Sequence, residues 1–383
     1  MNYNNLIPFI LISLWIAPTA LAQLNKKAFQ TPDKIFYPMP FWHINGSLNK
    51  QEIVRQMRDA KYKAGFEGVA ILPVARTQPE YLSEAYFEQY KNMLDTARDL
   101  NLKVIMYDDT GFPSGSAGGK VEKNHPEYVR RELIKHEYTF RKSRKWRYPV
   151  PKGHLMAAVA MEVNTKERVN LRPFISKGML YWDMPKDKDW KVMFFTTEIA
   201  PYWKDAYLVD YLNPKAVEKF IEYTYQEYAN RFSDYFQDRI DYTFFDDVGF
   251  LWVEKTWANA FNQKFKVLYG TDPDLLYPAL WYDIGKDTAA ARVALFNTRS
   301  ELLAEGFPKL VHQWSQKHGL KSTGHPPGNY DIQPVDMHGD IFKFFRYTDM
   351  PLMDYIIRYG RGRDGFKLIS SSAQQLPYMT ALL

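Results

Sequence analysis

Leu102-Lys103-Val104-Ile105-Met106-Tyr107-Asp108-Asp109 is a mostly apolar run of strand length that ends in two aspartates. A second stretch, Asp241-Tyr242-Thr243-Phe244-Phe245-Asp246-Asp247, has the same plan. Short runs of apolar, β-branched and aromatic residues predict buried strands. Helical patterns separate these runs along the chain, and strands that alternate with helices are typical of a parallel sheet. The sequence therefore predicts an α/β fold built from βα units.

Along the whole chain, the same pattern predicts eight strand starts with helices between them. Helices are expected at residues 49–64, 83–100, 213–232 and 292–318, the second with Ser83 as its N-cap. Strands are expected to begin at Ile35, Gly68, Leu102, Asp241, Lys321, Met353, Phe366 and Tyr378. Eight such units predict a (β/α)8 TIM-like barrel. The eighth unit is expected to be incomplete, because the sequence ends at Leu383.

Residues 126–212 interrupt this alternation. Two β-like segments, residues 156–163 and 192–199, lie there between turn-rich connections, and residues 141–147 form a basic run. We expect a small β-rich insertion within a catalytic domain of residues 23–383. The basic run could bind nucleic acid, but charge beside strand edges commonly blocks unwanted strand pairing, and we favour that interpretation. No nucleic-acid partner is expected.

Composition excludes several classes of protein. The chain has 383 residues, of which 46% are hydrophobic and 16% aromatic, so it can bury a full core. The absence of cysteine excludes disulfides, thiolate metal sites and a cysteine nucleophile. Aromatic residues exceed what a core requires, which suits stacking on flat faces of sugars or nucleobases. A net charge of +6 is modest and does not choose between the two.

The first 22 residues resemble a secretory signal peptide. The uncharged apolar run Leu6 to Ala17 is followed by Ala20-Leu21-Ala22, a small-residue pattern typical of a cleavage site, although no Lys or Arg precedes the run. A membrane anchor is the alternative, but the run is shorter than the roughly 20 residues that a span needs. No later segment is apolar enough to cross a bilayer. We expect a bacterial protein that is periplasmic or secreted, with no membrane span after removal of the signal.

Polar side chains follow several of the predicted strands and should meet at one face of a barrel. They are His43, Asn45, Asp108, Asp109, Asp246, Asp247 and His325, with Asp354 inside strand six. A ring of acids allows one carboxyl group to stay protonated while another is ionised, which is the pattern of a glycosidase. The alternative is that these aspartates cap helices in βα turns. For Asp109 both interpretations stay open, whereas Asp246-Asp247 favours a site, because an apolar or β-branched run precedes it.

The glycine-rich segment at residues 107–119 is the most unusual part of the chain. Its small residues let backbone approach a ligand closely, and Ser114 offers a hydroxyl. A phosphate-binding loop is disfavoured, because Gly119-Lys120 is followed by Val121 instead of Ser or Thr. Trp42 and Trp252 follow predicted strand ends and are expected to stack on a sugar ring. The histidines are scattered, so no histidine metal site is expected, while Ca²⁺ bound by oxygen ligands stays open.

These segments together resemble the catalytic barrel of glycoside hydrolase family 106, the α-L-rhamnosidases. The resemblance lies in residues 40–46, 81–84, 113–119, 210–214, 245–247, 323–325 and 366–371. It implies an inverting hydrolase that acts on a terminal rhamnose-like sugar of an oligo- or polysaccharide, with calcium as an optional cofactor. The implied catalytic residues are Asp247 and Asp354. The implied substrate-binding residues are Trp42, Asn45, Asp108, Asp109, Ser114, Asp210, Asp246, Trp252 and His325.

Two departures from the family pattern stand out. Family members have Asp-Glu-Pro where this chain has Asp246-Asp247-Val248, so the carboxyl group is shorter by one methylene. The family pattern also continues after Met-Thr to a glutamate on strand eight, whereas Met379-Thr380 here leads to Ala381-Leu382-Leu383. We expect a truncated copy of a longer enzyme. The alternative function is therefore a catalytically silent remnant that at most binds glycan.

Overall fold

The computed structural model describes residues 26–74, 76–141, 145–185, 187–203, 206–251, 253–328, 338–354 and 363–375. The chain divides into two compact units, Met1–Tyr37 and Pro38–Leu383. In its described part the first unit holds helix α1 (Lys26–Gln30) and the 3-10 helix η1 (Lys34–Phe36). Strand one was predicted to begin at Ile35, where the structure has η1 instead. The predicted signal peptide lies outside the described residues.

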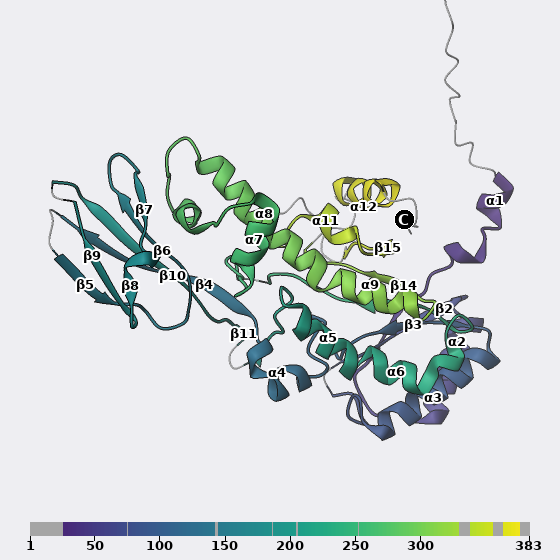
Figure 1. Cartoon of the computed structure of the whole chain (residues 1–383). Coiled ribbons are helices and arrows are strands. Elements are labelled where there is room, and N and C mark those ends of the chain that lie inside the picture. Colours follow the sequence, from purple (N-terminus) through teal and green to yellow (C-terminus); the bar gives the residue numbers. More distant parts are fainter. Residues whose placement is uncertain are drawn as a thin grey trace, which may run out of the picture. The chain divides into compact units, whose positions relative to one another are not determined.

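A six-stranded parallel sheet forms the centre of the second unit (Figure 1). Its strands, in spatial order, are β1 (Phe41–Ile44), β2 (Gly68–Pro73), β3 (Lys103–Tyr107), β13 (Ile240–Phe245), β14 (Lys321–Gly324) and β15 (Met350–Pro351). The mixed α/β class and the parallel pairing are as predicted. The closed eight-stranded barrel is not shown, since the described sheet has six strands and β1 and β15 form its ends.

Two predicted strands are wrong or displaced. Residues 366–370, predicted as strand seven, lie in helix α12 (Arg363–Gln375). Ile369 and Ser372 are buried there while Phe366 is 47% exposed, which is helical spacing. A short apolar run cannot be told from a buried helical turn by its pattern alone. Strand six was predicted to start at Met353, but β15 ends at Pro351. The eighth predicted strand, at Tyr378, lies outside the described residues.

Helices pack on one face of the sheet. They are α2 (Lys50–Tyr62), α3 (Glu84–Asp99), α5 (Pro214–Tyr223), α6 (Tyr225–Phe232), α8 (Thr288–Gly306) and α9 (Pro308–Lys317). The side chain of Ser83 accepts a hydrogen bond from the backbone N of Tyr86, so the predicted N-cap is confirmed. The helix predicted at residues 292–318 is two helices instead, because Pro308 has no N–H to continue the hydrogen-bond ladder. Thr224 likewise separates α5 from α6.

The two faces of the sheet bury different side chains, because successive residues of a strand point to opposite sides. The helix-covered face belongs to the large core, through Val69, Ile71, Val104, Met106 and Phe245. The opposite face carries a smaller cluster of Leu72, Tyr107 and Phe244. Polar residues that follow the strands at their carboxyl ends lie beyond both clusters.

Strands occupy the region where the β-rich insertion was predicted. A four-stranded antiparallel sheet has the order β4 (Arg131–Phe140), β10 (Trp190–Ile199), β6 (His154–Glu162) and β7 (Arg168–Asn170). A second sheet consists of β5 (Lys145–Pro149), β9 (Met179–Asp183) and β8 (Ile175–Ser176), and a third of β11 (Pro201–Trp203) and β12 (Ala206–Tyr207). Residues of β6 and β10 alternate between a separate small core and the large core.

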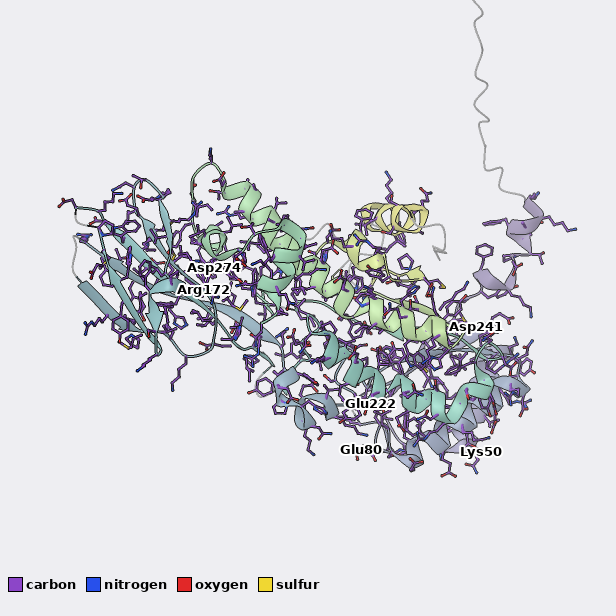
Figure 2. All side chains as sticks on the ribbon, in the orientation of Figure 1. Lys50, Glu80, Arg172, Glu222, Asp241 and Asp274 are labelled. Atoms are coloured by element: carbon purple, nitrogen blue, oxygen red, sulfur yellow. The ribbon has the colours of Figure 1, made fainter. Side chains whose placement is uncertain are left out.

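Contacts with the helical region hold this insertion in place. Phe195 of β10 packs against Tyr277 and Trp281, at ring-centroid distances of 5.3 and 5.5 Å. Arg172, in the 3-10 helix η3 (Arg172–Phe174), pairs at 2.5 Å with Asp274 at the start of η5 (Asp274–Leu280). Both residues are labelled in Figure 2. The insertion therefore packs on the main core instead of standing apart from it.

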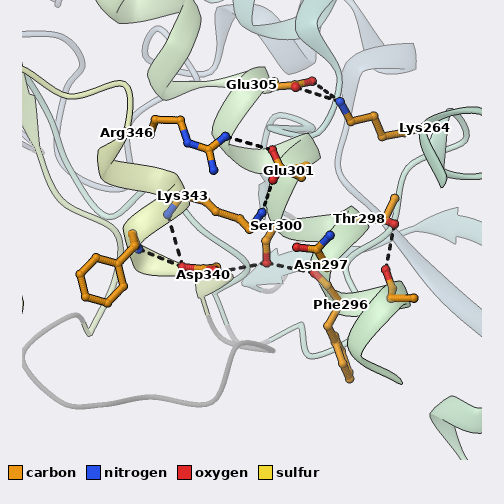
Figure 3. Close-up of polar contacts among 12 residues, drawn as sticks. Lys264, Phe296, Asn297, Thr298, Ser300, Glu301, Glu305, Asp340, Lys343 and Arg346 are labelled. Carbon is orange, nitrogen blue, oxygen red and sulfur yellow. Dashed lines mark hydrogen bonds and ion pairs between the residues drawn. The ribbon is translucent and has the colours of Figure 1, made fainter. Parts of the chain in front are cut away.

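Residues 340–346, which precede β15, make polar contacts with α8 (Figure 3). Helix α11 (Ile341–Phe345) begins after Asp340, whose backbone N donates to the Ser300 hydroxyl at 3.0 Å. Lys343 and Arg346 both pair with Glu301 of α8. These contacts also position β15, which follows directly in the chain.

The remaining short helices complete the described part of the chain. They are α4 (Lys120–Asn124), η2 (Pro126–Tyr128), η4 (Ser233–Tyr235) and α7 (Phe261–Tyr269). Lys264 of α7 pairs with Glu305 of α8 at 2.7 Å. Within the described ranges, no helix combines the length and the apolarity that crossing a bilayer demands.

Candidate active site

Asp246, Asp247 and His325 come together at the carboxyl ends of β13 and β14. One ligand-type atom from each lies within 4.8 Å of the others. Nε2 of His325 is 3.1 Å from Oδ1 of Asp246, and Nδ1 is 3.6 Å from Oδ1 of Asp247. The Tyr107 hydroxyl donates to the other carboxylate oxygen of Asp246 at 2.8 Å. The histidine ring thus stands between two neighbouring carboxyl groups.

Asp246 and His325 form a buried ion pair. Burial alone would raise the pKa of Asp246, but the hydrogen bond and charge of His325, the Tyr107 hydroxyl and the charge of His43 together outweigh it, so the pKa is lowered. Burial alone would lower the pKa of His325, but the same hydrogen bond and the nearby carboxylates raise it to about 9. Both groups are therefore charged near neutral pH, which makes the pair a fixed dipole at the end of the sheet.

The pKa of Asp247 is shifted in the opposite direction. Burial raises its pKa to about 6; the charges of Asp246 and Asp354 add to this effect, and His325 opposes it. Its buried Oδ1 has no hydrogen-bond partner among the described residues. The backbone there is left-handed, with φ of 52°, a conformation that aspartate tolerates better than most residues. Asp247 can therefore carry or release a proton near neutral pH without breaking a hydrogen bond.

Asp354 belongs to the same neighbourhood. It follows β15, the strand next to β14, and its charge raises the pKa values of both Asp247 and His325. Three adjacent strand ends thus contribute acidic or imidazole groups to one place. This convergence is the arrangement expected from the sequence for Asp246, Asp247, His325 and Asp354.

Asp109 has a different role from the predicted contact with sugar hydroxyls. Its side chain is 1% exposed. Its two carboxylate oxygens accept five backbone N–H groups, from Thr110, Gly115, Ser116, Ala117 and Gly118. Burial raises its pKa to about 6 against the opposing effect of these donors. The structure favours the capping interpretation, since Asp109 organises the glycine-rich loop and has no exposed oxygen to offer.

Asp108 and Ser114 are corrected for the same reason. The Ser114 hydroxyl donates to Oδ1 of Asp108 at 2.5 Å and accepts from the backbone N of Asp246 at 2.8 Å. The other oxygen of Asp108 accepts from Tyr225 at 2.7 Å. Both side chains are fully buried, so neither reaches a sugar. Their contacts instead tie the glycine-rich loop to the strand end that carries Asp246.

Three further candidates have their described contacts outside the cluster, and one cannot be placed. Trp42 packs against the helix-covered core, and its Nε1 donates to Gln56 of α2 at 2.8 Å. Asn45 borders the same cavity as Trp42, of about 140 Å³, beside α2. Asp210 is buried at the turn before α5, where burial raises its pKa to about 7 and its Oδ1 accepts from the Leu212 N. Trp252 lies outside the described residues.

The sequence did not single out Tyr107 or Phe112. Tyr107 precedes Asp108, and the two-residue period of a strand places its ring beside Phe244, with centroids 5.6 Å apart. This alternation could have predicted a hydroxyl near Asp246. Phe112 is 61% exposed on the glycine-rich loop, and no pattern in the sequence marks it. Its ring is therefore largely exposed on that loop.

The donors of the cluster do not fit the calcium ion left open by the sequence. Ca²⁺ takes six to eight oxygen ligands and avoids nitrogen. Here the imidazole of His325 occupies the space between the carboxyl groups of Asp246 and Asp247, so a nitrogen-bearing ring stands where oxygen ligands would be needed.

Comparison with solved structures bears on the fold. The chain is similar to the rhamnosidase from Novosphingobium sp. PP1Y, with a TM-score of 0.63 and 14% identity. The match covers 85% of this chain and 49% of the rhamnosidase, so the chain spans about half of that protein's length. The catalytic domain of a β-amylase from Paenibacillus polymyxa matches at a TM-score of 0.31 and 8% identity, over 89% of this chain and 92% of that one. No protein-family model and no curated protein matches the sequence.

The first of these likenesses shows that the chain shares its fold with part of that rhamnosidase. Parallel α/β sheets bind their ligands at the carboxyl ends of the strands. The cluster of Asp246, Asp247 and His325 lies at these ends.

Proposed function

We propose that the chain is a glycoside hydrolase of α-L-rhamnosidase type, related to glycoside hydrolase family 106, which removes a terminal deoxysugar from a complex glycan with inversion. One observation carries this proposal: Asp246 and Asp247 are adjacent carboxyl groups whose pKa values move in opposite directions. Pairs of titratable groups whose pKa values are shifted apart mark active sites, and the member with the raised pKa, Asp247, is the candidate acid. The rhamnosidase-like fold supports the substrate class.

The side chains divide the work as follows. Asp247, with its pKa raised to about 6, donates the proton to the leaving oxygen of the glycosidic bond. Asp354 is the second carboxyl group and accepts a proton from the attacking water. Inversion requires these two groups to stand about 6.5–9.5 Å apart across the sugar. The ion pair of Asp246 and His325 keeps a constant charge beside Asp247 and orients it.

Export is part of the proposal. The apolar run and cleavage-site pattern of residues 1–22 support delivery to the periplasm or the medium, where complex glycans are encountered. Detection of a mature protein that begins at Gln23 would test this part.

Hydrolysis of nitrophenyl α-L-rhamnoside by the purified chain tests the activity. We expect turnover that Asp247→Asn removes and that Asp234→Asn, a change at an exposed aspartate in η4, leaves intact. NMR of the first-formed sugar anomer reports inversion or retention. No turnover on a panel of aryl glycosides would overturn the proposal.

Glycan binding without turnover is the second candidate. It is favoured by Asp247, which stands where the family that the chain resembles has glutamate. Its carboxyl group is withdrawn by about one methylene, and a misplacement near 1 Å can cost about a hundredfold in rate. Asp247→Glu distinguishes the two functions: a gain in turnover supports a weakened enzyme, whereas binding without turnover in both proteins supports the second candidate.

A further inference from the structure

A hollow of about 330 Å³ opens between the glycine-rich loop, the segment after β2 and helix α4. Three basic side chains line it: Arg76, Lys120 and Lys123. Glu80, labelled in Figure 2, is the acidic side chain in the lining. The hollow therefore gathers like charges from two segments that are distant in sequence.

These cations have no ion-pair partner in the described part of the chain. Elsewhere on the same unit, Lys61 pairs with Glu67 at 3.0 Å and Lys91 with Asp95 at 2.7 Å. Unpaired cations that are held together repel one another, and a concave wall of low dielectric constant concentrates their field. The arrangement is unfavourable without an anion and becomes favourable when one is bound.

Glu80 offsets one of the three positive charges, and the carboxyl groups of Asp109 and Glu122 are engaged in hydrogen bonds. Asp109 lies at the base of the loop and directs both oxygens to backbone N–H groups. Glu122 of α4 accepts a hydrogen bond from the Ser116 hydroxyl, and burial raises the pKa of Glu122 to about 7. Lys120 and Lys123 are three residues apart in α4, a spacing that places both on one face of the helix.

Open backbone forms part of the lining. Gly118 and Gly119 have φ values of 64° and 84°, in the left-handed region. No atom lies within 4 Å of the position that a Cβ of Gly119 would take. A ligand can therefore approach this backbone closely, which a larger side chain would prevent.

The hollow adjoins the acidic cluster. The Tyr107 hydroxyl lies 2.8 Å from Oδ2 of Asp246 and 3.1 Å from the backbone O of Gly111. Gly111 follows Thr110, which lines the hollow. One extended ligand can therefore reach both places along the same edge of the sheet.

We propose that this hollow binds a sugar residue that carries an oxyanion, either a carboxylate or a sulfate ester, in the glycan that the acidic cluster attacks. Arg76, Lys120 and Lys123 supply the positive charge, and the glycine backbone allows close approach. The inference rests on the proposed function and adds that its glycan substrate is acidic.

Isothermal titration calorimetry of the full chain tests the inference. The probes are a hexuronic acid trisaccharide, its methyl ester and a neutral trisaccharide that carries one sulfate ester. We expect the acid to bind at least about tenfold more tightly than its ester, in a salt-sensitive manner. The sulfated probe decides the source: if it binds more tightly than the acid, the oxyanion is a sulfate ester, and if less tightly, a carboxylate.

A triple variant with Arg76→Gln, Lys120→Gln and Lys123→Gln should lose the preference for the acid. A control with Lys152→Gln, Lys215→Gln and Lys317→Gln removes as many exposed charges elsewhere and should keep it. Equal affinity for acid and ester in the unaltered chain, or a preference that survives in the triple variant, would overturn the inference. Equally tight binding of polyglutamate would overturn it too, because it would indicate a general polyanion surface.

The two proposals can fail separately. Nitrophenyl rhamnoside is neutral and does not need the hollow. Its hydrolysis without any preference for acidic probes would overturn the inference alone. A charge-dependent preference without hydrolysis would overturn the proposed function alone.

Discussion

Asp108-Asp109 and Asp246-Asp247 follow neighbouring strands of one sheet, β3 and β13, yet the two pairs differ in the donors that their carboxylate oxygens meet. The first pair meets donors at every carboxylate oxygen, from backbone N–H groups and from hydroxyls of Ser114 and Tyr225. The second pair shares one histidine ring, and Oδ1 of Asp247 has no hydrogen bond among the described residues. A carboxylate whose oxygens all accept hydrogen bonds stabilises the structure around it. A carboxylate with an oxygen that accepts none can take part in proton transfer.

Burial alone does not separate the two pairs. It raises the pKa of Asp109 and of Asp247 to about 6 in each case. The opposing influences differ: N–H donors act on Asp109, and the charge of His325 acts on Asp247. A perturbed pKa therefore marks a candidate, and the geometry of the donors decides its role.

The largest expected effect is a loss of hydrolysis, which tests the role of Asp247. Asp247→Asn removes the proton donor and should lower hydrolysis of nitrophenyl α-L-rhamnoside by about a thousandfold, within the range of general acid catalysis. The fold should persist, since the replaced oxygen has no hydrogen bond to lose. Steady-state kinetics and urea unfolding measure the two quantities. Turnover within about tenfold of the unaltered chain would contradict the assignment.

The next largest expected effect is a loss of stability, which tests the role of Asp109. Asp109→Ala removes the acceptor of five backbone N–H groups and should lower the free energy of unfolding by about 3 kcal/mol or more. Hydrogen exchange at Gly115 to Gly118 should accelerate. Asp234→Ala, at an exposed site, serves as the control. If Asp109→Ala unfolded at the same urea concentration as the unaltered chain, the loop would not depend on this carboxylate.

The pH dependence of stability tests the raised pKa of Asp247, because protonation of this group is linked to folding. The pKa of Asp247 is about 6 in the folded chain against an ordinary value of 3.8 for aspartate, so folding favours its protonated form. Its contribution to stability is fully present below pH 3.8 and is lost as pH rises towards 6. Asparagine does not titrate, so Asp247→Asn should gain about 2 kcal/mol relative to the unaltered chain over this range. Urea unfolding at several pH values measures it, and a constant difference would count against the shift.

The smallest expected effect concerns the link between the two pairs. Tyr107→Phe removes a hydroxyl that donates to Asp246 and lies beside the Gly111 backbone O. We expect a loss of about 1 kcal/mol in stability, typical of one hydrogen bond, and a rate lowered several-fold. A loss as large as that of Asp247→Asn would move Tyr107 into the chemistry itself.

The contrast also shows how far the sequence reaches. The alternation of short apolar runs with helical patterns was enough for the parallel sheet and for the position of Asp246, Asp247 and His325 at its carboxyl ends. It failed at residues 366–370, which lie in a helix, since a five-residue segment with three apolar residues fits either structure. The roles of Asp109 and Ser114 could not be predicted, because they depend on how the loop folds back onto its own carboxylates.

The most direct test is carbon-13 NMR of the side-chain carboxyl groups across a range of pH. It tests the claim that Asp247 is the member of its pair that carries a proton and whose Oδ1 accepts no hydrogen bond among the described residues. Of the signals that titrate near pH 6, which should include that of Asp109, one should vanish in Asp247→Asn and move to higher pH in His325→Gln, because the imidazolium holds the pKa of Asp247 down. A signal for Asp247 that titrates near its ordinary value of 3.8, or that ignores the loss of His325, would contradict the claim.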